Sequence, residues 1–164
     1  MRTLMAIFSV CFTMSVAQAA DFHFSDFAGI YNVKSCELEV NMIKQPGDYF
    51  CDLSMIVVTK KSDNEFDISY VLKSGVILHE ENLKAFEKSK EAMEDVATFT
   101  GYPDRAQWFR RFKDMKDNTF IDEMRQFSPS TDGEPFVHFV SAHGWVHDLD
   151  YKFTRYDYEL ERQK

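Results

Sequence analysis

The sequence predicts an all-β protein, an antiparallel up-and-down β-barrel of about eight to ten short strands. Segment 65–72 alternates over its whole length, so that Phe66, Ile68 and Tyr70 share one face and Glu65, Asp67 and Ser69 the other. This period of two is typical of a strand with one buried side. Similar runs follow one another closely with turn residues between them, and convincing helical periodicity is scarce. Closure of such a meander removes its exposed edges.

The first element is a leader at residues 1–19. One basic residue, Arg2, precedes an uncharged run from Leu4 to Val16, and the run ends in Ala17-Gln18-Ala19. This layout predicts a cleavable secretory signal peptide, with the mature chain beginning at Ala20. A short leader of this kind is typical of bacteria, so we expect a periplasmic or secreted product. Residues 20–164 have the size of one domain.

The first half of the mature chain reads as strands joined by turns. Gln45-Pro46-Gly47-Asp48 and Ser62-Asp63-Asn64 have the composition of turns, and Lys73-Ser74-Gly75 makes another. Segment 37–44 alternates as well and either extends the first strand or forms a flap. Connections this short require antiparallel pairing. The expected strands are 27–36, 51–59, 65–72 and 76–80.

The second half begins with an ambiguous segment, 81–95, which is rich in Lys and Glu. It fits a short helix or a charged hairpin, and we favour the hairpin. Gly144, together with the acidic Asp148 and Asp150, predicts a late turn. The strands expected in this half are 96–101, 106–113, 119–127, 135–142 and 151–161.

Charge excludes two classes of partner. The chain has 19 Lys and Arg, one of them in the leader, against 27 Asp and Glu. A mature protein this acidic is repelled by the phosphates of nucleic acids and by anionic lipid surfaces. After the leader, no stretch is apolar and long enough to span a bilayer as a helix. The remaining partners are a small apolar ligand or another envelope or secreted protein.

Two cysteines, Cys36 and Cys51, follow the leader. In an oxidising compartment an even number of cysteines predicts a disulfide. The spacing is not that of a Cys-x-x-Cys redox pair, and two isolated thiols are a poor zinc site. We therefore expect a structural disulfide between them.

The order of features resembles that of the lipocalin-like, or calycin, proteins. Gly29-Ile30-Tyr31 opens the first strand and is similar to the Gly-x-Trp signature of lipocalins, with Tyr31 in place of tryptophan. Arg155 lies where lipocalins carry an arginine late in the barrel. The resemblance implies a cup that binds small apolar molecules.

Enzymatic motifs are scarce, and we expect no cofactor. His138, His143 and His147 could together bind zinc with an open position for water, as in a metal-dependent hydrolase. They lack the glutamate of a His-Glu-x-x-His motif, which would serve as general base. No Gly-x-Ser-x-Gly motif or glycine-rich phosphate loop occurs. The sequence therefore favours a protein that is not an enzyme.

The aromatic residues provide the strongest functional hypothesis, an exported barrel that binds a small, largely apolar ligand. Inward-facing aromatic side chains either fill a small barrel or line a pocket, and the sequence leaves both open. The alternative is an interaction module with a filled core. The expected ligand-binding residues are Tyr31, Met55, Phe66, Tyr70, Trp108, Phe112 and Phe120.

Overall fold

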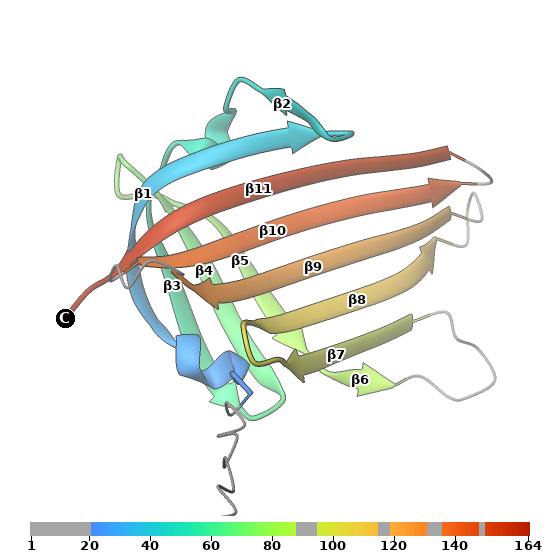
Figure 1. Cartoon of the computed structure of the whole chain (residues 1–164), viewed down its shortest axis with the longest axis horizontal. Helices are drawn as coiled ribbons and strands as arrows, with labels where there is room; N and C mark the ends of the chain where they lie inside the picture. The colour runs from blue at the N-terminus through green and yellow to red at the C-terminus, as the bar shows by residue number, and fades with distance from the viewer. Residues whose placement is uncertain (1–20, 88–94, 115–118, 131–135, 148–149) are drawn as a thin grey trace, which may run out of the picture.

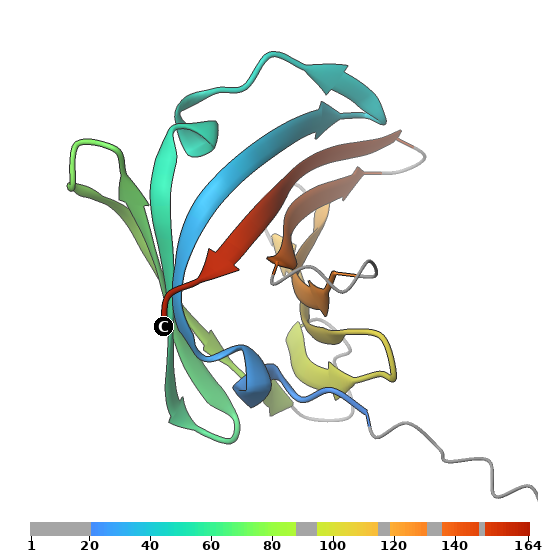
Figure 2. The same ribbon diagram turned by 60° about the vertical axis from the view of Figure 1, so that its left-hand side comes forward.

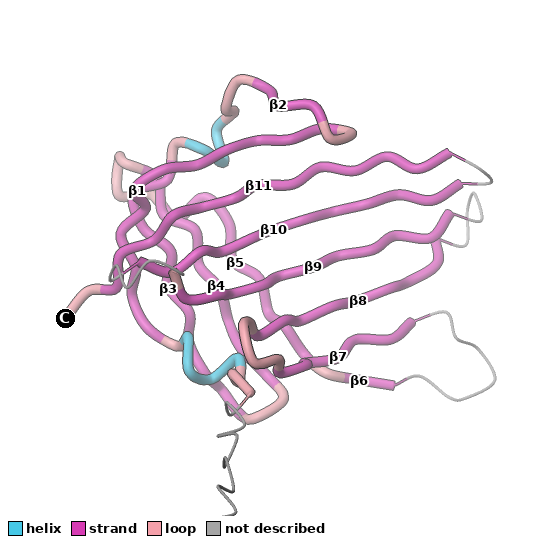
Figure 3. The backbone as a smooth tube through the Cα atoms, viewed as in Figure 1, coloured by secondary structure: helices cyan, strands magenta, loops and turns pink. Residues whose placement is uncertain are grey.

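The structure is a computed structural model and describes residues 21–87, 95–114, 119–130, 136–147 and 150–164. These residues form an 11-stranded antiparallel sheet that curls into a nearly closed barrel (Figure 1). Two single turns of 3-10 helix are the helices among the described residues, η1 (Phe24–Phe27) and η2 (Tyr49–Cys51) (Figure 3). The predicted fold class is confirmed. The predicted leader, residues 1–19, lies outside the described residues.

The strands follow the chain as a meander that brings the first strand against the last. Their order in the sheet is β5-β4-β3-β1-β11-β10-β9-β8-β7-β6, and β2 pairs only with β1. The strands are β1 (Gly29–Val40), β2 (Ile43–Gln45), β3 (Leu53–Ser62), β4 (Glu65–Leu72), β5 (Ile77–Lys84), β6 (Phe86–Glu87), β7 (Asp95–Gly101), β8 (Ala106–Asp114), β9 (Thr119–Pro129), β10 (Phe136–His147) and β11 (Asp150–Arg162).

The barrel closes through the backbone between β5 and β6. Only Ala85 separates these two strands, and they pair with β4 and β7 respectively. β5 and β6 are the two edge strands of the sheet, and no ladder joins them among the described strands. The chain therefore passes from one edge of the sheet to the other at Ala85. The Trp108 indole on β8 donates to the Lys84 carbonyl on β5 over 3.2 Å and bridges this seam. Figure 2 shows how strongly β1 bends to serve both β3 and β11.

Several strand boundaries differ from the sequence prediction, and the open question about segment 37–44 is answered. Glu37–Val40 continues β1, and Asn41 and Met42, both with positive φ, turn the chain into the short β2. In the ambiguous segment, β5 extends to Lys84 and β7 begins at Asp95, while residues 88–94 lie outside the description.

The predicted late turn is wrong at Gly144, because β10 runs through this residue to His147 and β11 begins only at Asp150. A Cβ at Gly144 would lie 2.9 Å from the Tyr151 hydroxyl on β11. The glycine therefore makes room for a neighbouring ring within the ladder and does not reverse the chain.

One end of the barrel is filled with aromatic side chains. The η1 turn inserts Phe24, whose ring lies 5.0–5.2 Å from those of Phe66, Phe99 and Phe127. Phe127 also stacks on Phe139 at 4.4 Å. The fully buried members of this core include Tyr31, Phe66, Phe127, Phe139, Tyr158 and Leu160. The rings around Phe127 are closely packed, whereas Phe24, Phe66 and Phe99 also line a cavity of about 290 Å³ beside η1.

Candidate functional site

The barrel interior changes from apolar to polar along β9 and β10. Alternate residues of a strand share a face. Glu123 and Arg125 therefore lie on the inner face of β9, in the two positions before the buried Phe127 on that face. On β10, Ser141 and His143 follow the buried Phe139 in the same way. The register places His143 directly opposite Glu123.

This polar region surrounds a cavity of about 380 Å³, which we call the mouth cavity. Its volume lies within the range of small-molecule sites, roughly 300–1,000 Å³. Its lining combines four aromatic residues with carboxylate, guanidinium, imidazole and hydroxyl groups. The lining residues are Phe50, Tyr70, His79, Glu81, Glu123, Arg125, Ser141, His143, Trp145, Thr154 and Tyr156.

A second cavity of about 360 Å³ lies at the seam between β5 and β8. It shares four lining residues with the mouth cavity: His79, Glu81, Glu123 and Arg125. Trp108 and Phe86 line it as well. The two cavities therefore meet at the charged residues of the interior.

A buried ion pair between Arg125 and Glu81 stands at this junction. The Arg125 Nε lies 2.9 and 3.0 Å from the two Glu81 oxygens, and its Nη2 lies 2.7 Å from Oε2. Nη1 donates to the carbonyls of Met124 and Ala142. The two side chains are only 10 and 12% exposed. Although burial opposes the guanidinium charge, facing groups including Tyr70 and Glu81 raise the pKa of Arg125 above its usual value. The pair joins β9 to β5 across the interior.

Glu123 is the second carboxylate of the mouth cavity. Its nearest charged neighbours are Arg110 Nη1 and His143 Nδ1, each 3.7 Å away. Both distances exceed those of normal hydrogen bonds. Burial lowers the pKa of His143, and Glu123 opposes that shift only in part. His143 is therefore neutral at pH 7 and gives Glu123 no full positive partner.

Tyr70 completes the buried part of the lining. It is only 2% exposed, and its hydroxyl has no hydrogen-bond partner among the described residues. Burial, reinforced by the negative charge of Glu81, raises the pKa of this phenol well above its usual value. Tyr70 is therefore a neutral, unsatisfied hydroxyl group beside the ion pair. Buried polar groups without partners are uncommon and call for an explanation.

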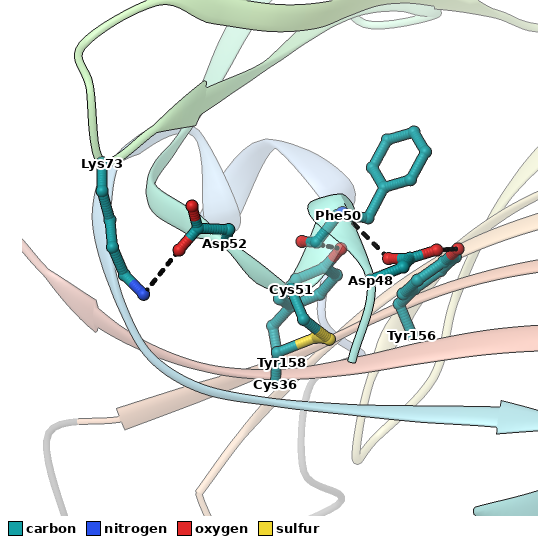
Figure 4. The surroundings of a disulfide bond; sticks show 8 residues. All are labelled: Cys36, Asp48, Phe50, Cys51, Asp52, Lys73, Tyr156 and Tyr158. Atoms are coloured by element: carbon teal, nitrogen blue, oxygen red, sulfur yellow. Dashed lines mark hydrogen bonds and ion pairs between the residues drawn. A yellow bond between two sulfur atoms is a disulfide. The ribbon is translucent and has the colours of Figure 1, made fainter. Parts of the chain in front are cut away.

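The segment Asp48–Asp52, which we call the strap, contributes Phe50 to the lining of the mouth cavity. Figure 4 shows the strap beside the disulfide that ties it to β1. The predicted disulfide is confirmed: Cys51 of the strap is bonded to Cys36 of β1. The Tyr156 hydroxyl donates to Asp48 over 2.8 Å, and the Tyr158 hydroxyl donates to the Phe50 carbonyl over 3.1 Å.

These anchors hold the Phe50 side chain in the cavity lining. Its ring lies 5.3 Å from that of Tyr156 and 6.4 Å from that of Tyr70. At the outer end of the strap, Lys73 pairs with Asp52.

The predicted ligand-binding residues are divided among five environments. Tyr70 lines the mouth cavity, and Trp108 lines the seam cavity. Tyr31 and Phe66 belong to the filled core. Met55 contacts Gln163 in an exposed region. The remaining two aromatics lie at the far ends of their strands, where Arg110 stacks on Phe112 at 4.3 Å and Lys113 lies 5.7 Å from Phe120.

Most of the mouth cavity was not predicted from the sequence. Glu81, Glu123 and Arg125 read as surface charges when each strand is considered alone. A signal was nevertheless present, because Glu123 and Arg125 are in phase with the apolar Phe127 of the same strand.

The three histidines do not share one environment. His143 lines the mouth cavity, whereas His138 lies five positions earlier on β10 and is exposed on the opposite face. The side chain of His147 lies outside the description. Among the described residues, no group of three or more His, Cys, Asp or Glu could hold a metal ion. A hydrolase site built on the three histidines stays a prediction.

Neither described helix has the length and apolar character needed to cross a membrane. Comparison of the chain with family models, with curated proteins and with solved structures finds no match. A functional proposal therefore depends on the geometry of the barrel interior.

Proposed function

We propose that this chain is an exported, non-enzymatic barrel that binds a small, largely apolar ligand in the mouth cavity. The observation that supports it most directly is the division of the interior. One end is packed largely with aromatic side chains and keeps only a smaller cavity of about 290 Å³, whereas the other keeps a cavity of about 380 Å³. Aromatic lining with a few convergent polar groups is typical of small-molecule sites.

The lining suggests how such a ligand is oriented. Phe50, Trp145 and Tyr156 offer apolar ring surface. Arg125 and Glu81 lie at the junction with the seam cavity, where the unsatisfied Tyr70 hydroxyl is also found. The ligand would place its apolar body against the rings and one polar group towards this junction.

Two further features support the proposal. A nearly closed meander that opens on Gly29-Ile30-Tyr31 is compatible with a lipocalin-like cup. The disulfide between Cys36 and Cys51 suits an oxidising compartment such as a periplasm or the extracellular space.

Native mass spectrometry of protein purified from its own host tests the proposal. We expect a bound small molecule in the wild-type protein and its loss in Ser141→Phe, which fills the cavity. His138→Phe adds the same ring to the exposed face of the same strand and should retain the molecule. A ligand-free wild-type mass, together with a water-filled cavity in a crystal structure, would contradict the proposal.

An interaction module is the second candidate, and one observation favours it. The hairpin of β1 and β2 presents Met42 and Ile43 with 83 and 63% of their surface exposed. Exposed apolar side chains of this kind occur at protein interfaces. Affinity purification from the host envelope should then recover one stoichiometric protein, and the double variant Met42→Ser, Ile43→Ser should lose it.

A further inference from the structure

The charges that face the mouth cavity point to a class of ligand. The cavity lining contains two carboxylates, Glu81 and Glu123, and one guanidinium, that of Arg125. His143 adds no full positive charge at pH 7, because burial lowers its pKa. Within this lining negative charge therefore exceeds positive charge, and the nearest further cation is the Arg110 guanidinium of the adjoining seam cavity, 3.7 Å from Glu123.

The one guanidinium of the lining is already engaged. Arg125 contacts both oxygens of Glu81 and donates to two backbone carbonyls. An anionic ligand would have to displace Glu81 from this pair or bind beside Glu123. Leaving either carboxylate unpaired in a partly buried site is costly. The geometry disfavours a carboxylate or phosphate ligand.

Glu123, in contrast, retains capacity to bind. Its side chain is only 20% exposed, and it accepts no hydrogen bond from the described residues. Arg110, which lies outside the mouth-cavity lining, and His143 both stay 3.7 Å away. A partly buried carboxylate gains most from a charged donor at hydrogen-bond distance.

The aromatic rings of the cavity would add to the binding of a cation. Trp145 packs against His143, with 4.4 Å between their ring centres, and so lies two residues along β10 from the residue that faces Glu123. Phe50 and Tyr156 pack against each other in the same lining. The faces of such rings attract ammonium groups.

We propose, on the premise that the mouth cavity is the ligand site, that the ligand is an amphipathic amine bound as its ammonium ion. The ammonium group pairs with Glu123, and the apolar body lies against Trp145, Tyr156 and Phe50. A hydroxyl analogue keeps the apolar contacts and loses the ion pair. A carboxylate analogue is repelled by Glu123.

Isothermal titration calorimetry with three probes of nearly equal size tests the inference: phenethylamine, phenethyl alcohol and hydrocinnamate. We expect the amine to bind at least about tenfold more tightly than the alcohol, and hydrocinnamate most weakly. Glu123→Gln should bring the affinity of the amine to that of the alcohol. Asp63→Asn removes one negative charge from an exposed side chain at the β3–β4 turn and should leave all three affinities unchanged.

The outcomes separate the ligand class from the proposed function. Equal affinities of amine and alcohol, both abolished by Ser141→Phe, would overturn the amine and leave the binding function intact. Failure of all three probes would also overturn the amine, and the host-purified native mass would still decide the binding function. If Glu123→Gln failed to fold, the comparison of the three probes on the wild-type protein would remain decisive.

Discussion

The ion pair between Arg125 and Glu81 offers the most direct test of how the barrel is held together. It links β9 to β5, two strands that are not neighbours in the sheet. Glu81→Gln keeps the size of the side chain and one carbonyl acceptor but removes the negative charge. The guanidinium of Arg125 would then remain largely buried without its paired carboxylate, with Glu123 as the negative charge left nearby.

The expected loss follows from the burial of the pair. Removing one member of a buried ion pair costs about 3–5 kcal/mol, because the remaining charge is uncompensated. Since Gln retains an acceptor and Arg125 keeps its two carbonyl partners, we expect the lower value, about 3 kcal/mol. For a domain of this size, such a loss lowers the melting temperature by roughly 10 °C.

Chemical denaturation monitored by tryptophan fluorescence measures this loss. The control is Asp52→Asn, which breaks the exposed pair with Lys73, whose two side chains are 61 and 67% exposed. An exposed pair is worth at most about 1 kcal/mol. The double variant Arg125→Met, Glu81→Leu should recover most of the stability, since apolar replacement of a whole buried pair is often neutral. A loss for Glu81→Gln no greater than that for Asp52→Asn would refute the reasoning.

Three further predictions concern the strap, the core and the cavity. Replacing both Cys36 and Cys51 by Ala should cost about 3 kcal/mol in chemical denaturation, because the disulfide spans a sequence separation of 15 residues; an unchanged midpoint would contradict this. Tyr31→Phe should cost about 1 kcal/mol, since the buried Tyr31 hydroxyl donates to a carbonyl of η1 over 2.8 Å, and the exposed Tyr49→Phe should cost nothing measurable. Burial lowers the pKa of His143 below 6.5, so the unfolded chain takes up this proton at a higher pH than the folded chain. The stability that His143 contributes is present above pH 6.5 and is lost as the pH falls through its folded pKa. As the pH falls through this range, the free energy of unfolding of His143→Gln should therefore decrease less than that of the wild type. Equal decreases in the two proteins would argue against this.

The sequence alone was sufficient for the sheet and its covalent link. The strict alternation of segment 65–72 became β4, with Phe66, Ile68 and Tyr70 buried. The short turns predicted antiparallel hairpins, and the closed meander follows from them. Cysteine count and compartment predicted the bond between Cys36 and Cys51. These features depend on local spacing, which is visible in one dimension.

Only the tertiary structure decided which face of a mixed strand points inward. In β9, Ile121, Glu123, Arg125 and Phe127 form one face, whereas Phe120 and Met124 belong to the other, and both faces carry apolar residues. Alternation shows which residues share a face but not which face points inward. Phe120 was therefore predicted to line the interior, although it lies on the other face. The partner of Arg125 lies 44 positions earlier in the chain, on a strand that is not its neighbour in the sheet. A buried charge becomes favourable only when the fold supplies such a partner, and spacing along the chain carries no trace of that pairing.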